Sequence, residues 1–80
     1  MISKLINIDP EIMSGAPVFA GTRVTIKTLF DYLEQGQTIE DFLEGFPSVT
    51  REQVLNLLEL AMQILTCKEK LSRIYEDLVG

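Results

Sequence analysis

The hydrophobic positions after residue 25 recur at the spacing of amphipathic helices. In the first two predicted helices the apolar residues fall at i, i+3, i+4 and i+7: Ile26, Leu29, Phe30 and Leu33, then Ile39, Phe42, Leu43 and Phe46. Thr25, Thr38 and Thr50 precede the three helices as N-cap residues, and Gln53 completes a capping box with Thr50. Gly36 is placed to end the first helix in a left-handed conformation. The pattern therefore predicts three consecutive helices.

The residues before these helices follow a different pattern. Residues 4–8 alternate as a short strand does, and residues 17–24 are rich in β-formers with a bend at Gly21. We predict a small sheet built from these two segments and packed on the helices. Because Gly15 and Gly21 permit bends that other residues resist, we interpret residues 14–26 as a scaffold rather than a site.

The last predicted helix has two apolar faces. No Gly or Pro lies between Ser48 and Val79, so either one long helix follows or a break lies near Thr66 and Cys67. Every a and d position of a heptad pattern is apolar: Leu57, Leu60, Ile64, Cys67, Leu71, Ile74 and Leu78. A separate stripe is expected to pack on the first two helices: Val54, Leu58, Ala61 and Leu65.

Two arrangements would cover the heptad face. A break near Cys67 would let the end of the chain fold back over the domain's own core. Alternatively, the heptad residues pair with another chain, and a self-paired seam makes a homodimer. The second arrangement is favoured because the two stripes together exceed what 80 residues can cover.

These elements predict a mainly α fold in a single domain, residues 1–80. Short β segments occupy residues 1–24, a three-helix core occupies residues 25–61, and a helical extension occupies residues 62–80. A short helix, a turn and a capped longer helix form the outline of a helix-turn-helix unit. We therefore expect a homeodomain-like or winged-helix-like domain that ends in a long helix.

The composition points to a binding module rather than an enzyme. The chain has no histidine, which is the commonest general base, and its single Cys67 cannot build a zinc site. Neither a phosphate-binding glycine loop nor a dinucleotide fingerprint occurs, and no small-molecule substrate is evident. We predict no catalytic, cofactor or metal site. Because the chain lacks a membrane-spanning run and a signal peptide and has one cysteine, we expect a cytoplasmic location.

Charge is distributed unevenly along the chain, whose net charge is −5. Residues 31–61 carry seven acidic residues and one basic residue, a net charge of −6. DNA binding depends on basic side chains that neutralise phosphates, so this acidic segment argues against it. The candidate nucleic-acid contacts are Arg23, Lys27, Arg51, Gln53 and Asn56. For Arg23 two roles remain open, an ion pair with the acidic helices or a phosphate contact.

The stretch from Ile8 to Ala61 resembles the small bacterial and archaeal proteins of domain-of-unknown-function family 433. The shared features are I-x-x-D-P-x-I-x-x-G-x-P-x-x-x-G-T-R, the helix start G-x-[ST]-x-x-[ED] and the turn [FY]-P-x-[LV]-[ST]. The resemblance implies a homeodomain-like or winged-helix-like fold and an antitoxin-like role of the VapB type, with PIN-like nucleases as partners. It supplies no established functional residues, and it does not cover residues 62–80.

Our leading hypothesis is a dimeric, non-enzymatic, antitoxin-like module that binds a protein partner through the long helix and the acidic middle segment. A competing hypothesis is a dimeric helix-turn-helix transcriptional regulator that contacts DNA through residues 50–56. A third is a structural oligomerisation domain.

Overall fold

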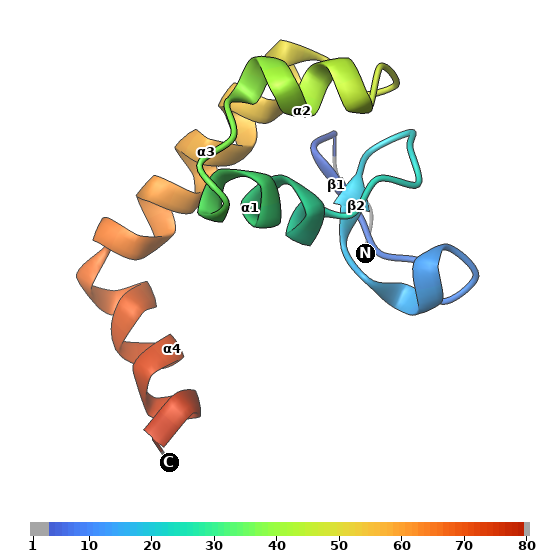
Figure 1. Cartoon of the computed structure of the whole chain (residues 1–80). Coiled ribbons are helices and arrows are strands. Elements are labelled where there is room, and N and C mark those ends of the chain that lie inside the picture. Colours follow the sequence, from blue (N-terminus) through green and yellow to red (C-terminus); the bar gives the residue numbers. More distant parts are fainter. Residues whose placement is uncertain (1–3, 80) are drawn as a thin grey trace.

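The computed structural model describes the backbone of residues 4–79 and the side chains of residues 4–76, and this part of the chain is mainly helical (Figure 1). Two short strands and one 3-10 turn precede four helices. In chain order the elements are β1 (Ile6–Asn7), η1 (Met13–Gly15), β2 (Val18–Phe19), α1 (Ile26–Glu34), α2 (Ile39–Gly45), α3 (Arg51–Thr66) and α4 (Lys68–Val79).

The predicted sheet is present, but its strands are shorter than the sequence indicated. β1 and β2 pair antiparallel, with Ile6 opposite Phe19. After Phe19 the chain turns at Gly21, whose φ of +77° favours glycine. The turn is closed by the backbone N–H of Phe19, which donates to the carbonyl oxygen of Val24 at 2.9 Å. The bend predicted at Gly21 is therefore confirmed, and the turn leaves no room for a strand over residues 17–24.

The three predicted N-caps are confirmed. The hydroxyl oxygen of Thr25 accepts from the backbone N–H of Thr28 at 3.2 Å at the start of α1. Thr38 and Thr50 each form a reciprocal capping box with the residue three positions later, at the starts of α2 and α3. These bonds satisfy N–H groups that the first helical turn cannot pair internally. At the other end of α1, Gly36 has a φ of +81°, as its predicted role requires.

We predict that Thr50→Ala lowers the free energy of unfolding by about 1 kcal/mol, because it removes the acceptor of the capping box. Thr50→Ser is the matched control, since it keeps the hydroxyl and is expected to retain most of the stability. Urea denaturation followed by circular dichroism measures both variants. Equal losses in the two variants would show that the hydroxyl does not stabilise α3.

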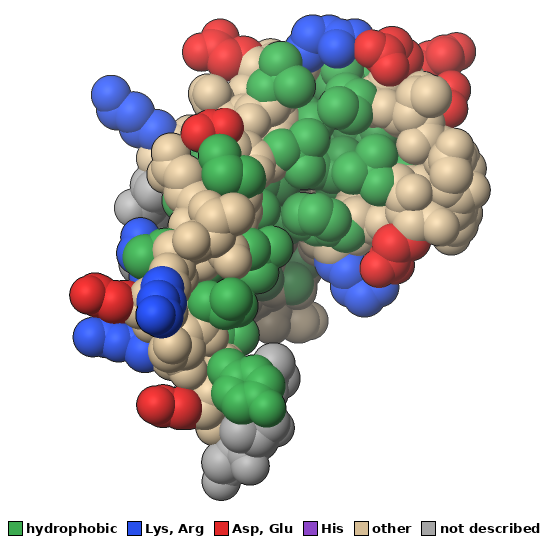
Figure 2. All heavy atoms as spheres, turned by 90° about the vertical axis from the view of Figure 1, so that its left-hand side faces the viewer, with side chains coloured by type: hydrophobic (Ala, Val, Ile, Leu, Met, Phe, Trp, Pro, Cys, Tyr) green, Lys and Arg blue, Asp and Glu red, His purple; other side chains and the backbone are tan. Residues whose placement is uncertain are grey.

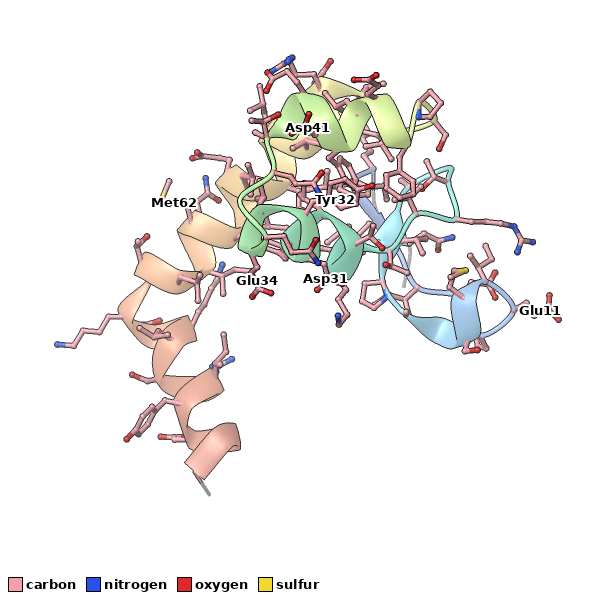
Figure 3. All side chains as sticks on the ribbon, viewed as in Figure 1. Glu11, Asp31, Tyr32, Glu34, Asp41 and Met62 are labelled. Atoms are coloured by element: carbon pink, nitrogen blue, oxygen red, sulfur yellow. The ribbon has the colours of Figure 1, made fainter. Side chains whose placement is uncertain are left out.

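The core lies where β2 and the first three helices meet. Its buried hydrophobic residues are Val18, Phe19, Leu29, Phe42, Val49, Val54 and Leu57. Phe42 is at the centre of a ring cluster: its centroid lies 6.0 Å from that of Phe19, 5.6 Å from Tyr32 and 5.1 Å from Phe46. Tyr32 extends from α1 toward α2 (Figure 3). Burial of β2 in this core places Val18 and Phe19, part of residues 14–26, against the helices.

One side chain connects the N-terminal segment to the start of α3. The side-chain oxygen of Gln53 accepts from the backbone N–H of Thr50 at 3.0 Å. Its side-chain nitrogen donates to the carbonyl oxygen of Ala20 at 3.0 Å. Gln53 therefore caps its own helix and also holds the turn that follows β2.

The long C-terminal helix is broken at Cys67, the second of the two alternatives that the sequence left open. Cys67 has an extended conformation (φ −82°, ψ 113°) between α3 and α4. No Gly or Pro causes the break. The hydroxyl of Thr66 donates to the carbonyl oxygen of Met62 at 2.8 Å, and bonding of this kind competes with the backbone ladder and bends helices. α4 does not fold back over the core; it extends away from α1 and α2 (Figure 1).

Candidate protein-interaction surface

The heptad residues of α3 and α4 do not lie on one exposed face. Leu57 is only 3% exposed and packs in the chain's own core. Leu60, Ile64 and Cys67 are half-buried, and Leu71 and Ile74 are exposed. The side chain of Leu78 lies outside the described residues. Because α3 turns the Leu57 side toward the core and the chain bends at Cys67, these positions cannot form one continuous coiled-coil seam.

The exposed apolar side of α3 consists of other residues. Leu55, Met62 and Leu65 are 49%, 46% and 58% exposed, and we call them the α3 stripe. They are seven and three positions apart, so they share one side of the helix. Leu65 was expected to pack on the first two helices, but α3 extends past their ends at this point (Figure 1). Met62 points away from α1 and α2 (Figure 3).

α4 adds a second exposed apolar group. Leu71, Ile74 and Tyr75 are 42%, 38% and 63% exposed, and we call them the α4 stripe. A hollow of about 330 Å³ beside them is lined by Leu71, Ser72, Tyr75 and Glu76. Figure 2 shows hydrophobic side chains gathered in a band along this side of the molecule, from the helical core toward α4. Both α3 and α4 therefore expose apolar side chains.

An acidic surface lies on α2, where Glu40, Asp41 and Glu44 are exposed. The guanidinium of Arg51 donates a hydrogen bond to Glu40 and holds the pKa of that carboxyl below its usual value. The backbone N–H of Thr38 donates to Asp41 at 2.9 Å and lowers the pKa of Asp41 as well. These carboxylates therefore stay charged at pH 7, and Glu44 is free of both contacts.

Three of the five candidate nucleic-acid contacts are engaged within the chain. Lys27 forms an ion pair with Asp31 at 2.9 Å, and this hydrogen bond raises the pKa of Lys27. Arg51 is paired with Glu40, and Gln53 holds Thr50 and Ala20. Arg23 and Asn56 are exposed. Sequence reasoning could not find the pairing of Arg51, because its partner lies on the preceding helix.

Arg23 lies at a hollow of about 690 Å³ between the N-terminal turns and α1. Four residues with hydroxyl groups also line this hollow: Thr22, Thr25, Thr28 and Ser48. Arg23 makes no ion pair with the acidic helices within residues 4–76, so the first of its two expected roles is not observed. Among the described residues that line the hollow, Arg23 carries the only charge, and the lining therefore assembles neither an acid–base pair nor a metal site.

None of the helices between residues 4 and 79 combines the length and the apolar run needed to cross a membrane. The chain is 31% identical over 51 residues to "Uncharacterized protein y4eO" of Sinorhizobium fredii (strain NBRC 101917 / NGR234). That match covers 64% of this chain but only 23% of the relative, so the chain spans about a quarter of the relative's length. No solved structure matches the chain. Residues 6–61 match the sequence profile of the family described as "Protein of unknown function (DUF433)", and the chain therefore belongs to this family.

Proposed function

We propose that this chain is a non-enzymatic, antitoxin-like module that binds a PIN-like nuclease and associates with itself. The observation that carries the proposal is the exposure of six large apolar side chains on α3 and α4, the residues of the two stripes. Exposed apolar residues grouped on one side of a helix, as in each stripe, are typical of surfaces that bind other proteins. A cytoplasmic location fits this role.

The arrangement of the helices is compatible with the homeodomain-like or winged-helix-like fold expected of such a module. α2 ends at Gly45 and α3 begins at Arg51, so a turn of residues 46–50 joins a short helix to a longer one. That is the outline of a helix-turn-helix unit. In our proposal this unit presents protein-binding surfaces and does not read DNA.

The acidic surface of α2 suits a nuclease partner. A nuclease holds RNA phosphates through basic groups, and an acidic protein surface is attracted to such groups and can cover them. Glu44 is the most suitable test residue because it is exposed, while Glu40 pairs with Arg51 and Asp41 caps α2. We propose that α2 faces the nuclease.

DNA binding is the competing function, and the helix-turn-helix outline is the observation in its favour. Lys27, Arg51 and Gln53 already have partners within the chain. Each of these side chains would have to leave its partner to contact a phosphate or a base, and this weighs against DNA binding. Arg23 and Asn56 are left to contact a duplex, and Asn56 lies on the same helix as Glu52 and Glu59. A purely structural oligomerisation domain is the remaining alternative.

Calorimetric titration with the purified product of a neighbouring nuclease gene tests the proposal. We expect binding by the wild-type chain and roughly tenfold weaker binding by Glu44→Lys, because a rim charge is reversed. Glu11→Lys is the matched control, since Glu11 is exposed on the N-terminal segment, and it should bind like the wild type.

Failure of the wild-type chain to bind the nuclease would contradict the antitoxin-like role. Retardation of the upstream DNA at about 50 mM salt would then support the regulator. If neither ligand binds and the chain only self-associates, the structural oligomerisation domain is the remaining function.

A further inference from the structure

The two apolar stripes lie on consecutive helices that cannot cover one another within one chain. Packing two helices antiparallel requires a connection of about 2–5 residues. Here Cys67 alone separates α3 from α4. The α4 stripe therefore cannot turn back onto the α3 stripe of the same molecule, and both remain exposed.

α4 also lacks sufficient support in a single chain. It has 12 residues, and an isolated helix of about 12–15 residues or fewer is only marginally stable in water. Its main contact is with α3, the helix directly before it. Burial of its apolar side against another helix would supply the stabilisation that its length does not.

The charges that border the two stripes are mainly acidic on α3 and mainly basic on α4; Arg51, four positions before Leu55, also borders the α3 stripe, and it is paired with Glu40. On α3, Glu52 lies three positions before Leu55, and Glu59 lies three positions before Met62. Residues three and four apart are neighbours on a helix surface, so both carboxylates border the α3 stripe. Both are exposed.

On α4 the neighbouring charges are basic. Lys68 lies three positions before Leu71, and Lys70 lies four positions before Ile74, so both border the α4 stripe. A separate polar row on α4 contains Glu69 and Arg73, which are four positions apart, whereas Glu76 lines the hollow beside Leu71 and Tyr75. With Arg51 neutralised by Glu40, the α3 stripe has a net acidic border (Glu52, Glu59) and the α4 stripe a net basic one (Lys68 and Lys70 against Glu76), so the two surfaces are complementary in net charge.

We propose that two copies of the chain dimerise by exchanging α4, so that the α4 stripe of each copy packs on the α3 stripe of the other. The two copies use the same pair of stripes and are related by a two-fold axis, so the contact between an α4 stripe and an α3 stripe occurs twice in the dimer. Glu52 and Glu59 of one copy then face Lys68 and Lys70 of the other. The inference rests on one part of the proposed function, the protein-binding role of the two apolar stripes, and it assigns a second copy as the occupant. The acidic side of α2 stays open to a nuclease.

This dimer differs from a coiled coil along the heptad positions. In a coiled coil α4 would pair with α4, and the α3 stripe would stay exposed. In the exchanged dimer a substitution in either stripe breaks the same contact. Sedimentation equilibrium of variant chains separates the two arrangements, because a substitution in the α3 stripe dissociates only the exchanged dimer, whose mass is twice the chain mass of 9.0 kDa.

The expected results are a dimer for the wild type and monomers for Met62→Asp and for Tyr75→Asp. Arg73→Asp is the control, because it places the same carboxylate on the polar row of α4, and it should remain dimeric. Circular dichroism should show folded chains in all cases, since none of the three residues is buried. A monomeric wild type, or a dimer that survives Met62→Asp, would overturn the proposal.

Charge reversal supplies a second measurement. Reversing both glutamates (Glu52→Lys with Glu59→Lys) or both lysines (Lys68→Glu with Lys70→Glu) should weaken dimerisation about tenfold. All four changes in one chain should restore it. If the fourfold variant is no tighter than the two double variants, the stripes do not face each other. A dimer that passes these tests but binds no nuclease refutes the proposed function alone.

Discussion

Phe42→Ala is expected to lower the free energy of unfolding by about 3–5 kcal/mol, the range for removing a buried phenyl ring. Phe42 is fully buried, and its ring contacts those of Phe19, Tyr32 and Phe46. It thus joins β2, α1 and α2, and its removal leaves a cavity bordered by several elements. Domains of this size are stable by about 5–15 kcal/mol in total, so the loss is a large fraction. Urea denaturation at one fixed protein concentration measures it.

Phe42→Leu is the matched control, because it stays apolar and fills more of the space than alanine does. We expect it to be clearly less destabilising than Phe42→Ala. If Phe42→Ala cost less than about 1 kcal/mol, the ring cluster would not be the centre of the core.

Leu57→Asp is expected to abolish cooperative folding, whereas Leu55→Asp leaves the chain folded. Leu57 is 3% exposed among apolar side chains, so an aspartate there would bury a carboxylate without a partner. Leu55 is 49% exposed, and a carboxylate there stays in water. Both changes are made in the Tyr75→Asp background, in which we expect no dimer, so that thermal melts report on the single chain.

Leu55 and Leu57 are two positions apart in α3 and therefore point to different sides of the helix. The comparison between them thus depends on how α3 is oriented against the core. Equal melting curves for the two variants would mean that Leu57 faces solvent, as the heptad pattern implied. A lost transition for Leu55→Asp would mean that the α3 stripe packs within the chain.

The helix boundaries could be predicted because the interactions that set them are local. An N-cap bond joins residues two or three positions apart, so Thr25, Thr38 and Thr50 identify the starts from a few letters of sequence. The break at Cys67 was left open because no Gly or Pro marks it, and a threonine such as Thr66, whose hydroxyl bonds back to Met62, also occurs in unbroken helices.

The orientation of α3 could not be predicted. Over two or three turns, periods of 3.5 and 3.6 residues select nearly the same positions, so Leu57 fits both a coiled-coil seam and a core-facing stripe. The choice depends on where α1 and α2 lie against α3, which is a tertiary property. Leu65 was assigned to the core for the same reason, and it is exposed because the neighbouring helices end before it.

Long-range polar contacts and unusual backbone conformations were also beyond sequence reasoning. Arg51 pairs with Glu40, eleven positions earlier, and nothing in the pattern singles out that carboxylate among its neighbours. Met13 and Ser14 have positive φ angles of 49° and 57° without being glycine. Only Gly15, the residue that follows them, indicated a turn.

Because Gln53 has two roles, the difference between glutamine and glutamate at this position is informative when homologous chains are compared. Glutamate and glutamine complete a capping box equally well, since each has an oxygen that accepts from the N-cap residue. Only glutamine also has the N–H that reaches Ala20. In homologous chains, an amide at this position would mark sequences that keep the N-terminal turn attached to α3, and a carboxylate would mark sequences in which selection for that attachment has been relaxed.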